Sequence, residues 1–349
     1  MLKRINIERY LNDFGSLPVV DVRSPAEYEK GHIPNAVNIP IFSDEERAVV
    51  GTTYKQESRE RAIEIGMKFV QPKLQSFIDD TLRVAPDKTV VVHCWRGGMR
   101  SQSFAQHLVD NGFEQVYVIV KGYKAFRNRV LDGFNGDAQL VVIGGYTGSA
   151  KTELIKHIKN TSDHQVIDLE RLANHRGSAF GGIDQGPQPT SEQFENNLFC
   201  EWKDLDLSQP ILIEDESRAI GSNVIPPALF ENMRKCRLYF LDIPREERAR
   251  HLVKDYGGGN KEALKGSITR ISSRLGGLNT RQAFQHLEQG EMYEVAKIML
   301  LYYDKYYSNG VAKRDPKMVT RIPSPTTNPI QNAIELRKVI DTSFDPLTP

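Results

Sequence analysis

The stretch V-V-V-H-C-W-R-G-G-M-R-S, residues Val90–Ser101, decides the fold of the first half of this 349-residue chain. An apolar β-branched run ends at Cys94, two glycines follow, and a helical pattern begins at Gln102. This order is typical of the strand-turn-helix unit of an α/β sheet. The sequence therefore predicts that Cys94 lies at the end of a strand and faces the N-terminus of a helix.

The same alternation continues in both directions and predicts two α/β domains. Further strands are expected at Pro18–Val22, Thr89–His93, Val116–Val120, Leu140–Ile143, Pro210–Ile213 and Leu238–Asp242, and helices at Arg59–Phe69 and Ser101–Asn111. A polar, Gly-rich joint at Asp132–Asp137 interrupts the pattern, so a boundary is expected near Gly136. The domains predicted are 1–135, 136–310 and a tail, 311–349, made of a Pro-rich loop and one helix at Pro329–Ile340.

Composition limits the classes of protein that this chain can belong to. The formal net charge is +1, so a nucleic-acid surface would have to be a local patch. The three cysteines, Cys94, Cys200 and Cys236, lie too far apart for a disulfide framework or a zinc cluster. Neither the N-terminal residues nor any apolar run is typical of a signal peptide or a membrane span. A cytoplasmic protein is the expectation.

The loop after Cys94 favours an ionised thiol. Glycine-rich backbone at a helix N-terminus directs N–H groups and positive potential toward the sulfur, which favours the thiolate. Arg96 and Arg100 add fixed positive charge, so the pocket suits an anionic substrate that carries a chalcogen or phosphorus atom. A buried, inert cysteine is the structural alternative. The glycines, the two arginines and the start of the helix favour the interpretation of Cys94 as a reactive thiol.

The segment D-V-R-S-P-A-E-Y-E-K-G-H-I-P-N-A-V-N-I-P, Asp21–Pro40, resembles the first signature of rhodanese-like domains. The resemblance covers about the first 130 residues and places Cys94 at the active-site cysteine of these domains. Five residues separate Cys94 from Arg100, where sulfurtransferases of this kind commonly have four. The wider loop resembles that of rhodanese-fold phosphatases and would hold a phosphate-sized group.

A second loop, G-G-Y-T-G-S-A-K-T at Gly144–Thr152, follows an apolar strand and precedes a helical pattern. This is the context of a phosphate-binding loop (P-loop), in which backbone N–H groups surround a diphosphate and a lysine neutralises it. Its candidate diphosphate-binding residues are Gly145, Gly148, Ser149, Ala150, Lys151 and Thr152. Ala150 replaces the usual glycine, and its Cβ is expected to crowd the phosphates. The structural alternative is a strand-turn-helix joint that merely favours glycine.

The strand I-L-I-E ends in a run of acidic residues, Glu214, Asp215 and Glu216. Such a strand end can place a carboxylate near the phosphates and a magnesium ion, as the second motif of P-loop proteins does. A solvated acidic turn is the alternative, so no metal ligand is firmly assigned. The guanine-recognition pattern N-K-x-D is missing, because N-K-E-A at Asn260 lacks its aspartate, and a switch GTPase is not expected.

Several basic residues are candidates for binding substrate or tRNA. His175 and Arg176 fall in a Gly-rich stretch, Leu172–Gly182, that is more typical of a binding lid than of a helix. Arg270 and Arg274 are four residues apart, so one helical face would present both to phosphates. Arg218 follows the acidic run. The aromatic run Leu300–Tyr307 is interpreted as core packing, with a prenyl-binding or base-stacking surface as the alternative.

In combination and in this order, C-W-R-G-G-M-R-S, G-G-Y-T-G-S-A-K-T, L-A-N-H-R-G-S and I-E-D-E-S-R-A-I-G resemble the bacterial tRNA 2-selenouridine synthases across nearly the whole chain. The resemblance implies an N-terminal rhodanese-like domain followed by a P-loop NTPase-like parallel α/β domain. It also implies an enzyme that replaces the sulfur of wobble 2-thiouridine in tRNA with selenium from selenophosphate. Geranyl diphosphate would first alkylate that sulfur and make it a leaving group.

Under this resemblance Cys94, Arg96 and Arg100 act on selenophosphate, and the P-loop holds geranyl diphosphate, with Mg²⁺ as a candidate ion and no tightly bound cofactor. A selenophosphate-producing enzyme is a candidate partner. Three alternatives remain open at this point: a rhodanese-type sulfurtransferase coupled to ATP-dependent tRNA activation, a phosphatase-like or arsenate-reductase-like thiol domain joined to a small-molecule kinase, and a non-enzymatic nucleotide-sensing RNA-binding module.

Overall fold

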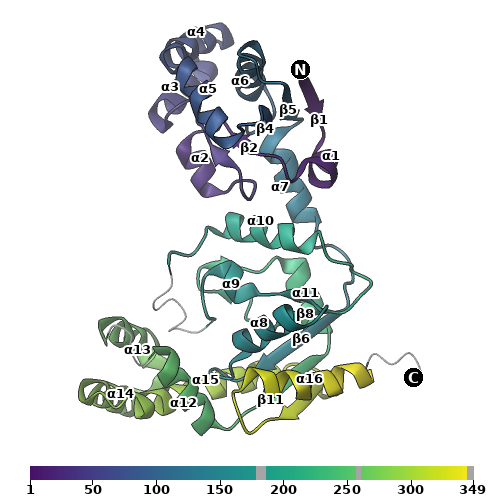
Figure 1. The fold of residues 1–349 in the computed structure, drawn as a ribbon. Coiled ribbons are helices and arrows are strands. Elements are labelled where there is room, and N and C mark those ends of the chain that lie inside the picture. Colours follow the sequence, from purple (N-terminus) through teal and green to yellow (C-terminus); the bar gives the residue numbers. More distant parts are fainter. Residues whose placement is uncertain (178–185, 257–260, 344–349) are drawn as a thin grey trace. The chain divides into compact units, whose positions relative to one another are not determined.

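The computed structural model of the protein describes residues 1–177, 186–256 and 261–343. The chain divides into two compact units, Met1–Gly133 with Glu195–Cys200, and Phe134–Phe194 with Glu201–Pro349. Both units are built on parallel sheets with helices (Figure 1), so the predicted fold class is confirmed.

The first unit contains a five-stranded sheet in the order β1-β5-β4-β2-β3, and every pairing is parallel. Its strands are β1 (Leu2–Ile5), β2 (Val19–Asp21), β3 (Val37–Asn38), β4 (Thr89–His93) and β5 (Gln115–Ile119). Its helices are α1 (Ile7–Arg9), η1 (Tyr10–Phe14), α2 (Pro25–Lys30), α3 (Asp44–Gln56), α4 (Arg59–Val70), η2 (Gln71–Lys73), α5 (Leu74–Val84), α6 (Met99–Asp110) and α7 (Gly122–Asp132).

Strand β4 is the central strand of this sheet, because its sequence is apolar on both faces. Val90, Val91 and Val92 are all fully buried, as expected for a β-branched strand covered on both sides. Helices α5 and α6 supply Phe77 and Phe104 to the same core. The carboxyl end of β4 therefore has a fixed position, and the residue that follows it is Cys94.

The signature Asp21–Pro40 folds around a buried ion pair. The Arg23 guanidinium donates to Asp21 at 2.6 Å and to the carbonyl oxygen of Gly31 at 2.7 Å, and both charged side chains are almost completely buried. Burial alone would raise the pKa of Asp21, but His93 and Arg23 outweigh burial and lower it. The signature thus fixes the chain between β2 and β3 beside the end of β4.

The second unit has a five-stranded parallel sheet in the order β12-β11-β6-β8-β7 and a two-stranded hairpin, β9 with β10. Its strands are β6 (Leu140–Gly145), β7 (Gln165–Ile167), β8 (Ile211–Glu214), β9 (Ala219–Ile220), β10 (Asn223–Val224), β11 (Leu238–Asp242) and β12 (Val319–Pro323). Its helices are α8 (Lys151–Thr161), α9 (Leu169–Ala173), α11 (Pro227–Lys235), α12 (Arg245–Tyr256), α13 (Lys261–Leu275), α14 (Gly277–Gln289), α15 (Met292–Val311), η3 (Pro316–Met318) and α16 (Pro329–Ser343). Helix α10 spans Ser191–Trp202.

The tail was predicted as a loop and a helix, but it also contains strand β12, which pairs in parallel with β11. Only Ile322 of this strand is buried, so its sequence carries too weak an apolar pattern to be read as a strand. Helix α16 then packs beside α8 on one face of the sheet (Figure 1). The tail is therefore an integral part of the second unit.

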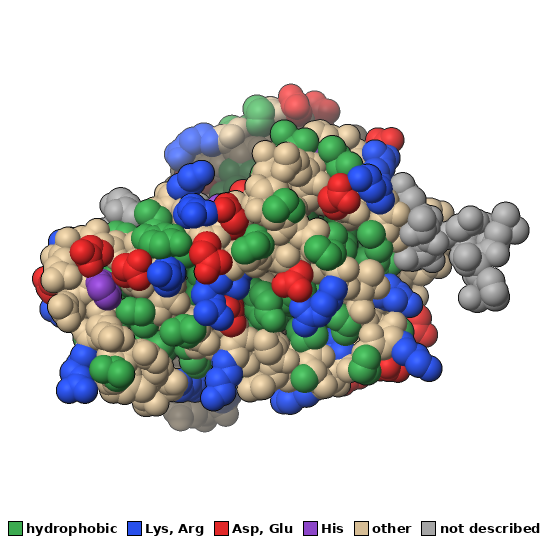
Figure 2. Space-filling view, turned by 90° about the horizontal axis from the view of Figure 1, so that it is seen from below, with side chains coloured by type: hydrophobic (Ala, Val, Ile, Leu, Met, Phe, Trp, Pro, Cys, Tyr) green, Lys and Arg blue, Asp and Glu red, His purple; other side chains and the backbone are tan. Residues whose placement is uncertain are grey.

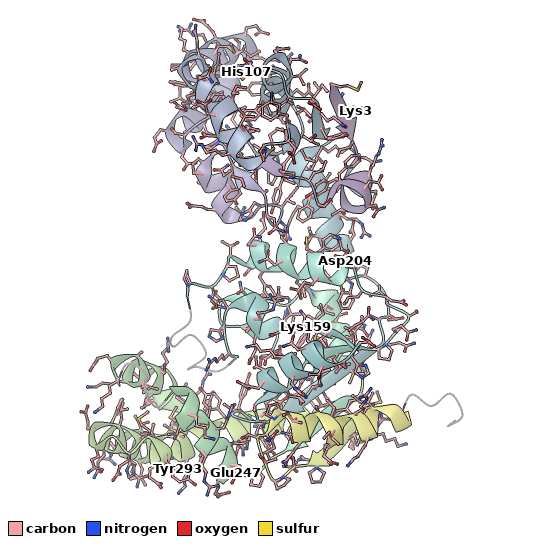
Figure 3. The ribbon with its side chains drawn as sticks, in the orientation of Figure 1. Lys3, His107, Lys159, Asp204, Glu247 and Tyr293 are labelled. Atoms are coloured by element: carbon pink, nitrogen blue, oxygen red, sulfur yellow. The ribbon has the colours of Figure 1, made fainter. Side chains whose placement is uncertain are left out.

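Helices α12, α13, α14 and α15 form a separate helical layer within the second unit (Figure 1). Helices α12 and α15 pack against each other; Figure 3 labels Glu247 on the first and Tyr293 on the second. The core of this layer includes Ile268, Leu287 and Met299. None of the helices in the described part of the chain is long and apolar enough to span a membrane.

Candidate active site

The thiol of Cys94 lies where strand β4 gives way to helix α6. Gly98 is the N-cap of α6 and offers no side-chain cap, so the N–H groups of the first helical turn have no intrahelical acceptor. Cys94 is only 3% exposed. The positive end of the helix therefore lies beside a thiol that water hardly reaches.

Backbone contacts hold this loop against the start of helix α7. The N–H groups of Tyr123 and Lys124 donate to the carbonyl oxygens of Cys94 and Trp95 at 2.9 and 3.0 Å. Gly97 and Gly122, both with positive φ, allow the cysteine loop and the start of α7 to come this close. A Cβ on Gly97 would lie 2.3 Å from the carbonyl oxygen of Ile119, and one on Gly122 would lie 2.0 Å from that of Cys94.

The two loop arginines have different environments. Arg100 is half-buried and donates to both carboxylate oxygens of Glu27, at 2.6 and 3.3 Å, whereas Arg96 is exposed. Burial would raise the pKa of Glu27, but the hydrogen bond and charge of Arg100 outweigh it and lower that pKa. Arg100 is thus held by a carboxylate that its motif did not predict. Glu27 lies in the R-S-P-A-E part of the signature, where it also accepts from the N–H of Ser24 at 3.2 Å.

The second loop joins strand β6 to helix α8 and has the backbone form of an anion site. Ala150 is the N-cap of α8 and provides no side-chain cap, so the first helical amides are again without an intrahelical acceptor. The Lys151 ammonium donates to the carbonyl oxygen of Gly145 at 3.1 Å and thus lies over the loop. The buried Ser149 hydroxyl donates to the carbonyl oxygen of Tyr146 at 2.6 Å.

Helices α12 and α15 brace this loop. Arg248 donates to the carbonyl oxygen of Thr147 at 3.1 Å and to both carboxylate oxygens of Asp304, at 2.8 and 3.0 Å. Its guanidinium also lies 4.8 Å from the centre of the Tyr146 ring. A Cβ on Gly148 would lie 2.9 Å from the carbonyl oxygen of Arg248, so the loop packs directly on α12. The sequence pattern gave no signal for Arg248.

Ala150 adopts a left-handed conformation, with φ 56° and ψ 35°. This conformation costs a residue with a Cβ about 1–2 kcal/mol, and glycine avoids that cost. We therefore expect Ala150→Gly to stabilise the second unit by about 1 kcal/mol. The measurement is urea unfolding followed by Trp202 fluorescence in a Trp95→Phe background, since the chain has two tryptophans and Trp202 belongs to the second unit. Unchanged or lower stability would show that the loop relieves the strain in another way.

Two carboxylates of the predicted acidic run lie beside the P-loop. Glu214 is opposite Ile143 of the neighbouring strand β6 and is fully buried; one of its oxygens accepts from the N–H of Glu170 at 3.2 Å. Its other oxygen, Oε1, is buried without a hydrogen-bond partner. Burial, and then the charges of Glu170 and Asp168, raise the pKa of Glu214 well above its usual value. Burial and Glu170 likewise raise the pKa of Glu216 to about 8.

Glu170 completes this group and was not predicted. It follows strand β7, is buried, and accepts a hydrogen bond from the Thr152 hydroxyl of the P-loop. Its sequence signal is weak, since an isolated glutamate in a short helix has no motif. We name Glu170, Glu214 and Glu216 the carboxylate group. No set of three His, Cys, Asp or Glu side chains in the described residues is arranged to hold a metal ion by itself.

Asp215 does not join the carboxylate group. Its carboxylate accepts from the Arg314 guanidinium at 2.8 Å and from the Tyr307 hydroxyl at 2.6 Å. Successive residues of extended chain point in opposite directions, so Glu214 and Glu216 share one side and Asp215 takes the other. The N–H of Gly145 donates to the Tyr307 hydroxyl at 3.5 Å, so Asp215 supports the loop from behind. Of the three acidic candidates for a metal or second-motif role, Asp215 therefore lies apart from Glu214 and Glu216.

The predicted basic residues are distributed over several elements. His175 lies in the turn after α9, accepts from the N–H of Gly177 at 3.1 Å, and has its pKa lowered by burial and by the charge of Arg270. The structure thus brings the His175 turn and α13 together. Arg274 is exposed on α13 and donates to the Tyr302 hydroxyl at 3.3 Å. Arg218 is exposed before β9, and Arg176 is exposed beside His175. Residues 178–182 of the predicted lid lie outside the described residues.

The two loops define the class of protein. A cysteine loop at a strand end precedes a P-loop unit, and comparison with protein families agrees: the rhodanese-like domain matches residues 6–129, and the tRNA 2-selenouridine synthase AAA domain matches residues 138–328. The chain is 35% identical to the tRNA 2-selenouridine synthase of Nitrosomonas europaea, over 85% of this chain and 90% of that one. It is 32% identical to the same enzyme of a Sulfurovum species, over 89% of this chain and 94% of that one. The chain belongs to the tRNA 2-selenouridine synthase family and is an enzyme.

Proposed function

We propose that this enzyme converts wobble 2-thiouridine in tRNA to 2-selenouridine through an S-geranyl-2-thiouridine intermediate. Geranyl diphosphate and selenophosphate would be the two donors. The observation that carries the proposal is the presence in one chain of two loops that each lead into a helix N-terminus, one with the buried thiol of Cys94 and one with Lys151. Two anionic donors need two such loops, and relatives named tRNA 2-selenouridine synthase share most of the chain.

The first step would take place at the P-loop. The sulfur of thiouridine attacks C1 of the geranyl group, the C–O bond to the diphosphate breaks, and the N3 proton of the base leaves to solvent. Negative charge develops on the departing pyrophosphate. Amide groups at the start of α8 and the Lys151 ammonium are placed to stabilise that charge.

Magnesium fits the residues beside this loop. Mg²⁺ in such sites uses one or two protein oxygens together with phosphate oxygens and water, so a complete protein cage is not required. The unpartnered Oε1 of buried Glu214 and the Thr152 hydroxyl are the protein atoms that would hold it. Bound Mg²⁺ would supply positive charge to the diphosphate. Its charge would also favour the ionised forms of the carboxylate group.

The second step would use the thiol loop. Selenium from selenophosphate attacks C2 of the alkylated base, the C–S bond breaks, and geranyl thiolate leaves. The P–Se bond of the donor is cleaved, and water supplies the oxygen of the released phosphate. Arg96 and Arg100 would neutralise the phosphoryl group. Cys94, as a thiolate, would orient the selenium of the donor without forming a bond to it, and a selenophosphate-producing enzyme would supply the donor.

Mass spectrometry of nucleosides tests this proposal. The purified protein is incubated with 2-thiouridine tRNA, geranyl diphosphate and selenophosphate, and each donor is omitted in turn. We expect geranyl-thiouridine to accumulate without selenophosphate, and selenouridine to form only when both donors are present. Selenouridine or another modified base that forms with ATP in place of geranyl diphosphate, with tRNA-dependent ATP turnover, would instead support the sulfurtransferase with ATP-dependent tRNA activation.

Helix α13 is our candidate for contact with the tRNA backbone. Arg270 and Arg274 are both exposed on it. Tyr302, which accepts from Arg274, lies 6.3 Å from the 58% exposed Tyr306 between ring centres, with 30° between the ring planes. Figure 2 shows a face of the molecule on which basic and acidic side chains are mixed. A local patch is what the net charge of +1 requires.

We expect the double variant Arg270→Ala with Arg274→Ala to weaken tRNA binding about tenfold at 0.15 M salt. The slope of log affinity against log salt should fall by about 1.5, because two phosphate contacts are lost. The measurement is filter binding over a salt series. The matched control is Arg61→Ala with Arg83→Ala, which removes two exposed arginines that are paired with Glu64 and Asp80. Equal losses for both double variants would mean a general charge effect and would remove α13 as the binding face.

A further inference from the structure

Ser101 contacts the sulfur of Cys94 and has no part in the function proposed above. Its Oγ lies 3.2 Å from Cys94 Sγ and also 3.2 Å from the carbonyl oxygen of Gly98. Ser101 is completely buried, and Cys94 nearly so. A serine hydroxyl has a single proton to donate and can accept as well. While the thiol is neutral, its S–H donates to Ser101, and Ser101 donates to Gly98.

Loss of the thiol proton to solvent changes this pattern. The sulfur is then an acceptor only, so the contact survives only if the Ser101 hydroxyl turns its proton from Gly98 to the sulfur. The Gly98 carbonyl oxygen does not lose its last partner, because the N–H of Gln102 also donates to it, at 3.1 Å. Hydrogen bonds to a charged acceptor are stronger than neutral ones. The rearrangement therefore exchanges a neutral hydrogen bond for a charge-assisted one.

We propose that Ser101 is a positioning residue that stabilises the thiolate of Cys94 by turning its hydroxyl proton from the Gly98 carbonyl to the sulfur. It adds a side-chain donor to the amides at the start of α6. That the thiolate is the working form rests on the proposed function. The hydrogen-bond exchange itself involves only residues of this loop.

The competing role for Ser101 is structural. A serine in the first turn of a helix commonly bonds to nearby backbone, and the bond to Gly98 would serve that purpose with a neutral thiol. Both roles predict a loss of stability in Ser101→Ala. Only thiolate stabilisation predicts a change in the pH at which the sulfur becomes reactive, so the pH profile of the thiol separates the two roles.

The experiment measures the rate at which iodoacetamide alkylates Cys94 in the intact protein from pH 5 to pH 10. Mass spectrometry of the Cys94 peptide separates this thiol from Cys200 and Cys236, which serve as internal references. We expect Ser101→Ala to move the midpoint of the Cys94 profile upward by about one pH unit, a tenfold loss of thiolate at pH values below both midpoints. Ser101→Thr keeps the hydroxyl and should keep the profile of the unaltered protein.

A Cys94 profile that is the same in Ser101→Ala and the unaltered protein overturns the proposal, whether or not the variant is less stable. A shift that Ser101→Thr shares with Ser101→Ala also overturns it, because the hydroxyl would then not be the cause. The assay contains no selenophosphate and no tRNA. A failure of the proposed function would therefore appear in the nucleoside analysis and leave this profile unaffected.

Discussion

Lys151→Ala should stop the formation of geranyl-thiouridine, with a fall in rate of about 10²–10³-fold. Its ammonium lies over the P-loop, 3.1 Å from the Gly145 carbonyl oxygen, where a diphosphate would replace that contact. Removing one fixed donor from a developing anion typically has an effect of this size. The measurement is the single-turnover rate of geranyl-thiouridine formation without selenophosphate.

Cys94→Ala should leave the geranylation step intact and impair the second step, the formation of selenouridine. Geranyl-thiouridine should form at the rate of the unaltered protein and accumulate, while selenouridine falls at least about 100-fold, because the thiolate of the second step is lost. The same nucleoside analysis, with both donors present, measures both products. Comparing the two variants therefore shows which loop is needed for geranylation and which for the replacement of sulfur by selenium.

Lys156→Ala is the matched control for Lys151→Ala, since Lys156 is an exposed lysine on the same helix, α8. It should change neither step. If Cys94→Ala blocks geranylation as strongly as Lys151→Ala does, the division of the two steps between the two loops is wrong. If Lys151→Ala geranylates normally, the P-loop holds a different substrate.

Gly122→Ala should destabilise the first unit by at least about 3 kcal/mol. The new Cβ would lie 2.0 Å from the Cys94 carbonyl oxygen and 2.6 Å from the Gly97 nitrogen, and φ at this position is +53°. Both neighbours are backbone atoms that cannot rotate away, so the thiol loop or the start of α7 has to shift. The measurement is urea unfolding followed by Trp95 fluorescence in a Trp202→Phe background.

Gly112→Ala is the control that separates two causes of lost stability, the steric clash of the new Cβ and the cost of a left-handed alanine. Gly112 also has a positive φ, +87°, but a Cβ there would meet only the Lys88 ammonium, at 3.9 Å. It should cost about 1 kcal/mol, the ordinary cost of a left-handed alanine. Equal losses for the two variants would mean that the loop absorbs the clash at Gly122, and the fixed geometry argued for the Cys94 loop would not hold.

The sequence predicted the elements whose signals are local. The strands at Thr89–His93 and Leu238–Asp242 have the predicted bounds, because a short apolar run between polar turns is a strong strand signal. The backbone course of both loops could be predicted for the same reason, since strand, glycine turn and helix are consecutive along the chain. Strand β12 was missed, because a half-exposed edge strand is defined mainly by its pairing with β11.

The partners of the site residues could not be predicted in this way. Glu27 and Arg100 are 73 residues apart, and Asp215 and Arg314 are 99 residues apart. No motif links such pairs, because they meet only when separate strands and helices pack together. The acidic run shows both cases. Its three acidic residues could be identified from the sequence, but the different partners of Glu214 and Asp215 depend on which side of the chain each side chain faces.

The sequence by itself determined the family, the α/β class and the two loops of this protein, since each depends on residues close together in the chain. The tertiary structure decided which groups act on those loops. The strand order places β8 beside β6, and Glu214 at the end of β8 accepts from the N–H of Glu170, which itself accepts from the Thr152 hydroxyl. Helices α12 and α15 bring Arg248 and Tyr307 behind the P-loop. The physical reason is that burial and hydrogen bonding between distant segments depend on packing in three dimensions, which no local pattern encodes.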